Sequence, residues 1–221
     1  MHSDGQHKSR GRGYGFLIIA HIAALLPLAW LCLDAARGQL GFNPIREVTL
    51  RTGRYGLVLL VLSLACTPVY VLSGWRQTIV LRKLFGLYGT GYIVLHFMVF
   101  AGWDYGFQLD LIWIEIRDRR FIQVGLLALL ILIPLAITST RWWMRRLGKH
   151  WKRLHRLVYL ADLLAVLHFL LLVKADRRRP LVYGAIVLVL LVVRIPFVRD
   201  ALASMRRSGS LPRRQRENHN S

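Results

Sequence analysis

The stretch LHRLVYLADLLAVLHFLLLV, residues 154–173, is apolar enough to lie in a lipid bilayer, yet it contains two histidines, His155 and His168. A polar side chain in hydrocarbon is costly unless it is paired, so histidines inside a membrane span point to a functional site. Two questions follow: how many such spans the chain contains, and what these histidines bind.

Long unbroken apolar runs dominate the chain, which has 221 residues and is 55% hydrophobic. About 20 helical residues cross the roughly 30 Å hydrocarbon core of a bilayer. Six runs approach this length: Phe16–Leu33, Tyr55–Leu72, Phe85–Gly102, Ile122–Thr138, His155–Val173 and Leu181–Val198. We therefore expect an all-α membrane protein. The predicted bundle of six transmembrane helices occupies residues 15–199, between an N-terminal tail at 1–14 and a basic C-terminal tail at 200–221.

The net charge of +20 could suggest binding to nucleic acid, but no part of the chain resembles a soluble domain that could hold it. The distribution of the basic residues instead fits the rule that positively charged segments stay in the cytoplasm. With six spans and a cytoplasmic N-terminus, 18 Lys and Arg lie on the cytoplasmic side and 11 on the other. This asymmetry predicts that both termini are cytoplasmic. The basic fourth loop would also contact anionic lipid head groups of the bilayer.

Two histidines on different helices are expected at the same depth in the membrane. Phe85 and His155 start two helices that are expected to run in the same direction. His96 lies 11 residues after Phe85, and His168 lies 13 residues after His155. At about 1.5 Å per residue the two depths differ by only about 3 Å. Two imidazoles that face each other across a helical bundle are typical ligands of a haem iron.

Glycines precede the first of these histidines. Gly89 lies two helical turns before His96, on the same face, and Gly91 is close by. These glycines would either let a flat macrocycle approach the backbone or serve the packing of one helix on another. The sequence does not decide between the two roles.

His155 lies about 20 Å below His168 along the helix axis, a separation that suits two stacked redox centres. On an ideal helix the two side chains point roughly 140° apart, so a shared face would require a kink, a tilt or another ring placement. A lower haem would therefore have His155 as one ligand and an unidentified second ligand, for which His21 is the nearest histidine by depth. The alternative is that these histidines are packing residues with hydrogen-bonded partners.

Three motifs carry a resemblance to a known family: RKLFGLYGTGYIVLHF at 82–97, ITST at 137–140 and WKRLHRLVYLADLLAVLHF at 151–169. Together they resemble the MsrQ (YedZ) family, and more broadly the ferric-reductase-like transmembrane domain. The resemblance covers roughly residues 15–200. It implies that His96, His155 and His168 bind the cofactor as ligands of haem iron. Many relatives have a tryptophan where this chain has Leu171, which leaves a role for that tryptophan in doubt.

The same resemblance implies a multi-pass protein of a bacterial inner membrane that binds one or two b-type haems, with FMN as a further candidate cofactor. Electrons would come from the quinone pool or a cytosolic flavin reductase. They would pass to a periplasmic molybdopterin enzyme of the MsrP type, a heterodimer partner that reduces methionine sulfoxide in oxidised proteins. The chain would then be an electron-transfer subunit without a catalytic site of its own.

Two alternatives remain at this stage. The first is a quinol-linked membrane cytochrome that reduces ferric iron. The second is a small transporter or scaffold without redox chemistry, whose histidines relay protons or pack. The tails of about 15 and 22 residues contain no dinucleotide-binding motif, so we expect the electron donor to be a separate molecule.

Overall fold

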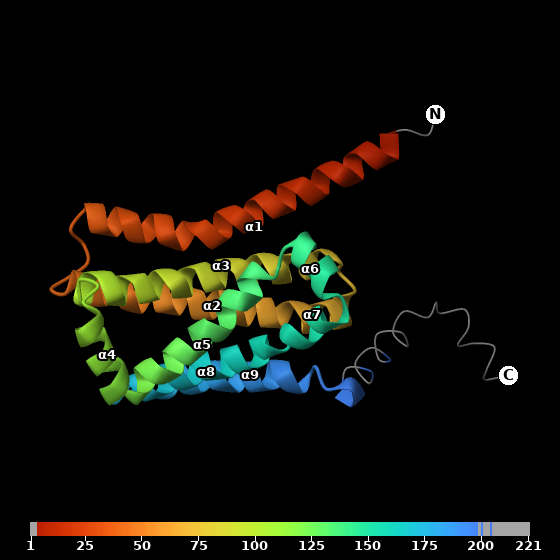
Figure 1. The fold of residues 1–221 in the computed structure, drawn as a ribbon. Helices are drawn as coiled ribbons and strands as arrows, with labels where there is room; N and C mark the ends of the chain where they lie inside the picture. Colours follow the sequence, from red (N-terminus) through yellow and green to blue (C-terminus); the bar gives the residue numbers. More distant parts are fainter. Residues whose placement is uncertain (1–3, 199, 201–203, 205–221) are drawn as a thin grey trace.

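The computed structural model describes residues 4–198, 200 and 204. Within them the secondary structure is helical (Figure 1). The elements in chain order are α1 (Asp4–Ala36), α2 (Pro44–Ser73), α3 (Gln77–Val99), the π-helix η1 (Phe100–Asp104), α4 (Leu109–Asp118), α5 (Arg120–Ile137), α6 (Arg141–Leu147), α7 (Lys149–Leu154), α8 (Leu157–Leu172) and α9 (Arg178–Val192).

Five helical segments of the described residues are long and apolar enough to cross a membrane. They are Gly15–Ala36, Pro44–Ser73, Gln77–Asp104, Arg120–Ile137 and Lys149–Leu172. These segments coincide with the first five apolar runs of the sequence. The predictions of an all-α fold and of a multi-pass membrane protein are therefore confirmed, with five spans identified by length and composition.

The sixth expected run, Leu181–Val198, is not continuous. Its helix α9 ends at Val192, and residues 193–195 form a turn before helical backbone resumes at Pro196. Proline lacks a backbone N–H, and its ring clashes with the carbonyl four residues earlier, which here belongs to Val192. With 15 residues, α9 is shorter than the other spans, so a sixth crossing remains a prediction.

Helix ends are marked by local sequence signals. The Asn43 side chain accepts a hydrogen bond from the Arg46 backbone N–H, and Pro44 occupies the first turn of α2, where a missing N–H costs nothing. At the other end Gly74 adopts a φ of 72°, which favours glycine, and its N–H donates to the Tyr70 carbonyl. These two signals limit α2 to one pass and direct the chain back as α3.

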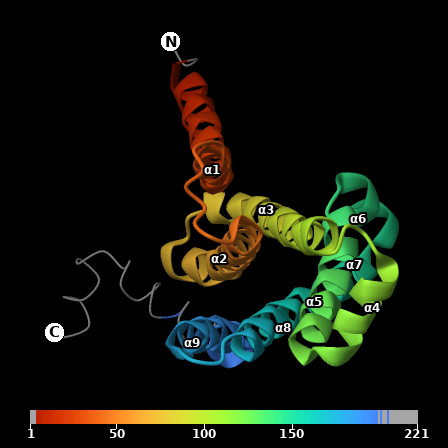
Figure 2. The same ribbon diagram turned by 90° about the vertical axis from the view of Figure 1, so that its left-hand side faces the viewer.

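The bundle is built from two helical hairpins in two layers. Helices α2 and α3 pack along each other, as do α5 and α8, and contacts between α3 and α5 and between α2 and both α8 and α9 join the two pairs. Helix α1 packs on α2 and α3, on the side away from α5 and α8 (Figure 2). Helix α4 marks one end of the bundle, here named the α4 end. Helices α6 and α7 mark the other, named the α6–α7 end, where α1 starts and α9 finishes (Figure 1).

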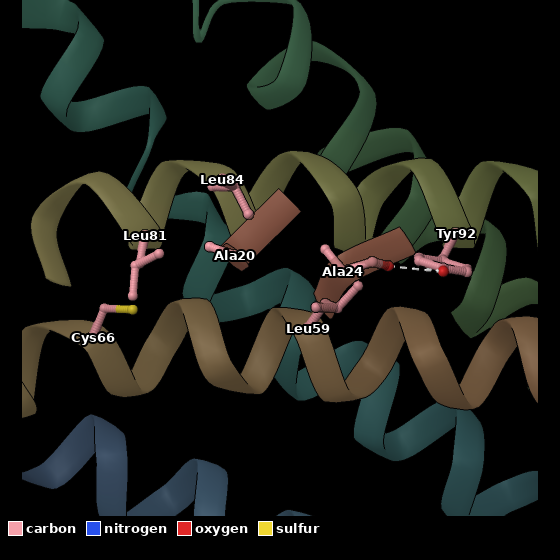
Figure 3. Packing of buried hydrophobic residues seen from close by; sticks show 7 residues of the cluster. All are labelled: Ala20, Ala24, Leu59, Cys66, Leu81, Leu84 and Tyr92. Atoms are coloured by element: carbon pink, nitrogen blue, oxygen red, sulfur yellow. Dashed lines mark hydrogen bonds between the residues drawn. The ribbon is translucent and has the colours of Figure 1, made fainter. Parts of the chain in front are cut away.

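Small residues allow α1 to approach the α2–α3 hairpin closely. Ala20 and Ala24 are buried against α2 and α3, where the Tyr92 hydroxyl donates a hydrogen bond of 2.9 Å to the Ala24 carbonyl (Figure 3). The cluster of buried residues comprises Ala20, Ala24, Leu59, Cys66, Leu81, Leu84 and Tyr92. Tyr92 lies one turn before His96, so this packing fixes the stretch of α3 that carries the first candidate ligand.

Candidate haem site

The structure brings together His96 on α3 and His168 on α8, as their equal depth predicted. The centres of the two imidazole rings lie 6.1 Å apart, and the ring planes are inclined by 82°. The ring of Phe121, on α5, lies 5.9 Å from that of His168. The two histidines come from different hairpins, so the tertiary structure is required to form the pair.

A backbone carbonyl fixes the orientation of each ring. Nδ1 of His96 lies 2.8 Å from the Thr49 carbonyl oxygen, and Nδ1 of His168 lies 2.7 Å from that of Phe121. A carbonyl only accepts, so in both rings Nδ1 carries the proton and donates. The deprotonated Nε2 is then the nitrogen with a lone pair free for a metal, and such a hydrogen bond at the other nitrogen is usual for metal-ligating histidines.

A glycine on the neighbouring helix lies against each ring. A Cβ atom at Gly53 would lie 3.0 Å from Nδ1 of His96, and one at Gly125 would lie 2.6 Å from Nδ1 of His168. Neither position has room for a side chain without a shift of the imidazole. Each glycine lies four residues after the residue whose carbonyl accepts the hydrogen bond, on the same helix, so glycine and carbonyl face the same histidine.

The two hairpins hold their histidines in the same way. His96 is 47 residues after Thr49, and His168 is 47 residues after Phe121. Positions 49 and 121, 53 and 125, and 96 and 168 all differ by 72 in residue number. The same spacing of carbonyl, glycine and histidine therefore recurs in the α2–α3 pair and in the α5–α8 pair.

Analysis of the sequence missed Thr49, Gly53, Phe121 and Gly125. A signal for them was present, because a comparison of the chain with itself at an offset of 72 aligns both the glycines and the histidines. The signal is weak, because only the glycine and the histidine are identical at the two sets of positions. The carbonyl can come from any residue type, so Thr49 and Phe121 do not match.

The geometry of the His96–His168 pair fits a metal ion that is already held by a macrocycle and needs only two protein ligands. Metal–imidazole bonds are about 2.0 Å long and a ring centre lies roughly 1 Å behind its nitrogen, so two rings on one metal have centres roughly 6 Å apart. The observed 6.1 Å agrees with this value. In the described part of the chain no group of three or more His, Cys, Asp or Glu could hold a bare ion. A haem iron, which has four porphyrin nitrogens, needs only these two protein ligands.

The two glycines that precede His96 most closely, Gly89 and Gly91, have different surroundings. A Cβ at Gly89 would lie 3.1 Å from the backbone nitrogen and side chain of Leu60, so this glycine serves the close packing of α3 on α2. At Gly91 a Cβ would have no atom within 4 Å. The glycines that contact the histidine rings are Gly53 and Gly125, on the other helix of each hairpin.

His155 lies apart from this pair, at a break between α7 and α8. The helix is interrupted by a turn at His155 and Arg156, so the angle expected for an ideal helix does not apply between His155 and His168. The His155 ring stacks on Trp151, with centres 4.0 Å apart, and its Nε2 lies 3.4 Å from the Ser139 hydroxyl. The ITST motif contributes to this arrangement, because the Trp151 indole N–H donates to the Thr138 carbonyl.

His155 lines a pocket of about 220 Å³ near the α6–α7 end, here named the inner pocket. The residues of α3 that line it include Arg82, Lys83 and Thr90, and no second histidine of the described residues does so. His21, the suggested partner of His155, is not in this pocket. Its Nδ1 lies 2.9 Å from the Tyr88 hydroxyl, so the structure does not bring this candidate together with His155. Depth alone suggested that pairing, whereas α1, which carries His21, packs on α2 and α3, on the side away from α8 (Figure 2).

Comparison with known proteins agrees with the helical pattern. Residues 52–166 match the model of the ferric reductase like transmembrane component family, and this range includes His96 and His155. No solved structure is significantly similar to the chain.

Relatives of known family cover most of the chain. A protein of Rhodospirillum rubrum is 46% identical over 197 residues, which are 88% of this chain and 92% of the relative. A protein of Caulobacter vibrioides is 42% identical over a stretch that covers 79% of this chain and 83% of the relative. A protein of Deinococcus radiodurans is 46% identical over a stretch that covers 72% of this chain and 79% of the relative. All three are named protein-methionine-sulfoxide reductase heme-binding subunit MsrQ. The chain thus belongs to the MsrQ family, whose membrane domain is of the ferric reductase like transmembrane type.

Proposed function

We propose that this chain is a transmembrane electron relay that holds a b-type haem between His96 and His168. The observation that carries the proposal is the geometry of the pair, with ring centres 6.1 Å apart and each Nδ1 bound to a carbonyl. The relatives are named heme-binding subunits, which agrees with this assignment. A bound haem supplies a one-electron carrier in the middle of a roughly 30 Å insulating layer.

The chain's own residues would hold this site rigid. The Thr49 and Phe121 carbonyls fix the tautomer and rotation of the two imidazoles, and Gly53 and Gly125 bring the neighbouring helices against the rings. A rigid ligand pair suits electron transfer because little has to move when the charge changes.

The direction of transfer follows from the proposed orientation. Both termini and the α6–α7 end lie in the cytoplasm of a bacterium, with α9 as the sixth span in the inner membrane. Electrons come from the quinone pool or a cytosolic flavin reductase and leave at the α4 end. The acceptor is a periplasmic molybdopterin methionine-sulfoxide reductase of the MsrP type, which agrees with the reductase system in the relatives' name.

The number of haems follows from the ligands. The pair of His96 and His168 makes one complete site. His155 stays the candidate ligand of a second haem, but the described lining of the inner pocket offers it no second histidine. We therefore propose one haem per chain. FMN stays a candidate cofactor on the cytoplasmic side, where the chain would receive electrons.

A spectroscopic experiment tests the proposal. The purified full-length chain should show a Soret band, and pyridine haemochrome analysis should give about one b-type haem per chain. After reduction, oxidised protein substrate should reoxidise the haem only when the periplasmic reductase is present. A colourless chain expressed with ample haem would rule out the relay. Equally fast reoxidation by ferric citrate without the reductase would favour ferric iron as the acceptor.

A further inference from the structure

A second pocket lies beside the inner pocket, between α2, the first turns of α3, α8 and the turn after α9. It has a volume of about 140 Å³ and is here named the arginine pocket. Two of its lining residues, Arg82 and Arg194, also line the inner pocket, so the two pockets adjoin at these side chains. The rest of its lining includes Thr67, Val71, Tyr159 and Val193.

The two arginines carry more hydrogen-bond donors than the described residues use. A guanidinium has five N–H donors and no acceptor. Arg194 donates to the Tyr159 hydroxyl and the Leu64 carbonyl, which hold its side chain in place. The Arg82 guanidinium has no hydrogen-bond or ion-pair partner among the described residues. Both side chains therefore have donors left for a ligand that accepts hydrogen bonds.

The charges around the two pockets do not balance. Their linings contain three cationic side chains, Arg82, Lys83 and Arg194, and one acidic side chain, Asp162. Neither carboxylate oxygen of Asp162 has a hydrogen-bond partner among the described residues, so this acid is not hydrogen-bonded to either arginine. Positive charge that is only partly compensated is costly next to hydrocarbon, and a bound anion would neutralise the excess.

The depth of the arginine pocket matches that of the lipid head groups. Helix α2 has 30 residues and is therefore about 45 Å long, which equals the thickness of a bilayer with both head-group layers. Thr67 and Val71 lie about 9 Å and 3 Å along the axis before its last residue, Ser73. This end of α2 belongs to the α6–α7 end of the bundle (Figure 1). The pocket thus lies where phospholipid phosphates are found.

Exposed apolar side chains flank the charged lining. Leu72 on α2, Leu160 on α8 and Val192 on α9 are each next in sequence to a lining residue, and they are 46 to 52% exposed. On a membrane-spanning bundle such side chains contact acyl chains. An anion that carries acyl chains therefore fits this place better than a free anion.

We propose that the arginine pocket binds the phosphate of an anionic phospholipid, with Arg82 and Arg194 as the donors. Phosphate oxygens accept several charge-assisted hydrogen bonds, and basic pockets between membrane helices suit such head groups. The excess of positive charge also selects among lipids. Phosphatidylcholine brings its own cation next to Arg82 and Lys83, whereas phosphatidylglycerol brings none. The proposal goes beyond electron transfer and needs no haem.

Native mass spectrometry of the full-length chain in detergent tests the proposal with three probes. They are dioleoyl phosphatidylglycerol, dioleoyl phosphatidylcholine and inorganic phosphate. One molecule of phosphatidylglycerol should bind roughly 10-fold more tightly than phosphatidylcholine, because the choline cation is repelled. Equal affinities for the two lipids would overturn the proposal. Inorganic phosphate at the same concentration should not displace phosphatidylglycerol, and displacement would mean that the pocket takes a free anion instead of a lipid.

Two variants locate the site. Arg82→Gln should lower the affinity for phosphatidylglycerol to about that for phosphatidylcholine, and unchanged binding in this variant would contradict the proposal. Arg153→Gln, on α7, is the matched control, because it removes the same charge at the same end of the bundle but lines neither pocket. An equal loss in both variants would mean that the lipid is attracted by the whole basic α6–α7 end.

The test does not depend on the folding of one variant. If Arg82→Gln does not fold, the unaltered chain and Arg153→Gln still decide. A preference for phosphatidylglycerol that is the same in both supports the pocket, and its loss in Arg153→Gln overturns the proposal.

Discussion

Gly125 lies so close to His168 that a Cβ atom in its place would come within 2.6 Å of Nδ1 and 2.9 Å of Cε1. The hydrogen bond from this same Nδ1 to the Phe121 carbonyl fixes the ring in that position. The glycine therefore sets where the imidazole stands, and Gly53 does the same for His96 at a slightly greater distance.

Replacement of Gly125 by alanine should move the His168 ring and weaken haem binding. Changes next to a metal ligand commonly lower affinity by about 10- to 100-fold, and we expect a loss in this range. Haem titration into the haem-depleted chain measures it, and electron paramagnetic resonance of the loaded chain reports the ring orientation. Gly91→Ala is the matched control, since its Cβ would meet no atom within 4 Å. An equal loss in both variants would mean that the effect comes from helix flexibility.

Replacement of either histidine of the pair should remove the same haem. His96→Ala and His168→Ala should each remove the same haem, because either change leaves a single protein ligand. His155→Ala should retain most of the haem absorbance, since His155 lies in the inner pocket away from the pair. Visible spectra of the three purified variants measure this. Loss of all haem in His155→Ala, with haem intact in His168→Ala, would require a different ligand pair.

The ion pairs of Arg51 should contribute to stability near the α4 end. Arg51 bonds both Asp34, at the end of α1, and Glu47 on its own helix, and Asp34 is 8% exposed. Arg51→Gln would leave the Asp34 carboxylate buried without its partner, which is costly. In a double-mutant cycle with Asp34→Asn, we expect a coupling free energy of roughly 1–3 kcal/mol from unfolding in detergent. A coupling near zero would mean that water replaces the arginine.

The distribution of charges predicts the orientation of the chain. If the chain has six spans, 18 basic residues lie on one side and 11 on the other, and a reporter fused to the C-terminus should be active in the cytoplasm. Paired reporters, one active only in the periplasm and one only in the cytoplasm, measure this in whole cells. An active periplasmic reporter at this position would reverse the predicted orientation. A fusion in the loop between α8 and α9 also tests whether α9 crosses the membrane, because it should report the opposite side.

The sequence by itself determined the membrane class, five of the spans and the equal depth of His96 and His168. These properties follow from hydrophobicity and residue spacing along single helices, which are local and need no knowledge of neighbours. The motifs around the histidines also determined the family. Pro196 was visible as well, but its effect on the sixth run was underestimated.

Only the tertiary structure decided which groups face the histidines. The rotation and neighbours of a helix depend on how small residues such as Gly89 and Ala24 let backbones approach, and that packing is not written in any one segment. For this reason the roles of Gly53 and Gly125, and the separation of His21 from His155, could not be read from spacing. The juxtaposition of Asp162 and Arg194 has the same origin, because it joins α8 to the turn after α9.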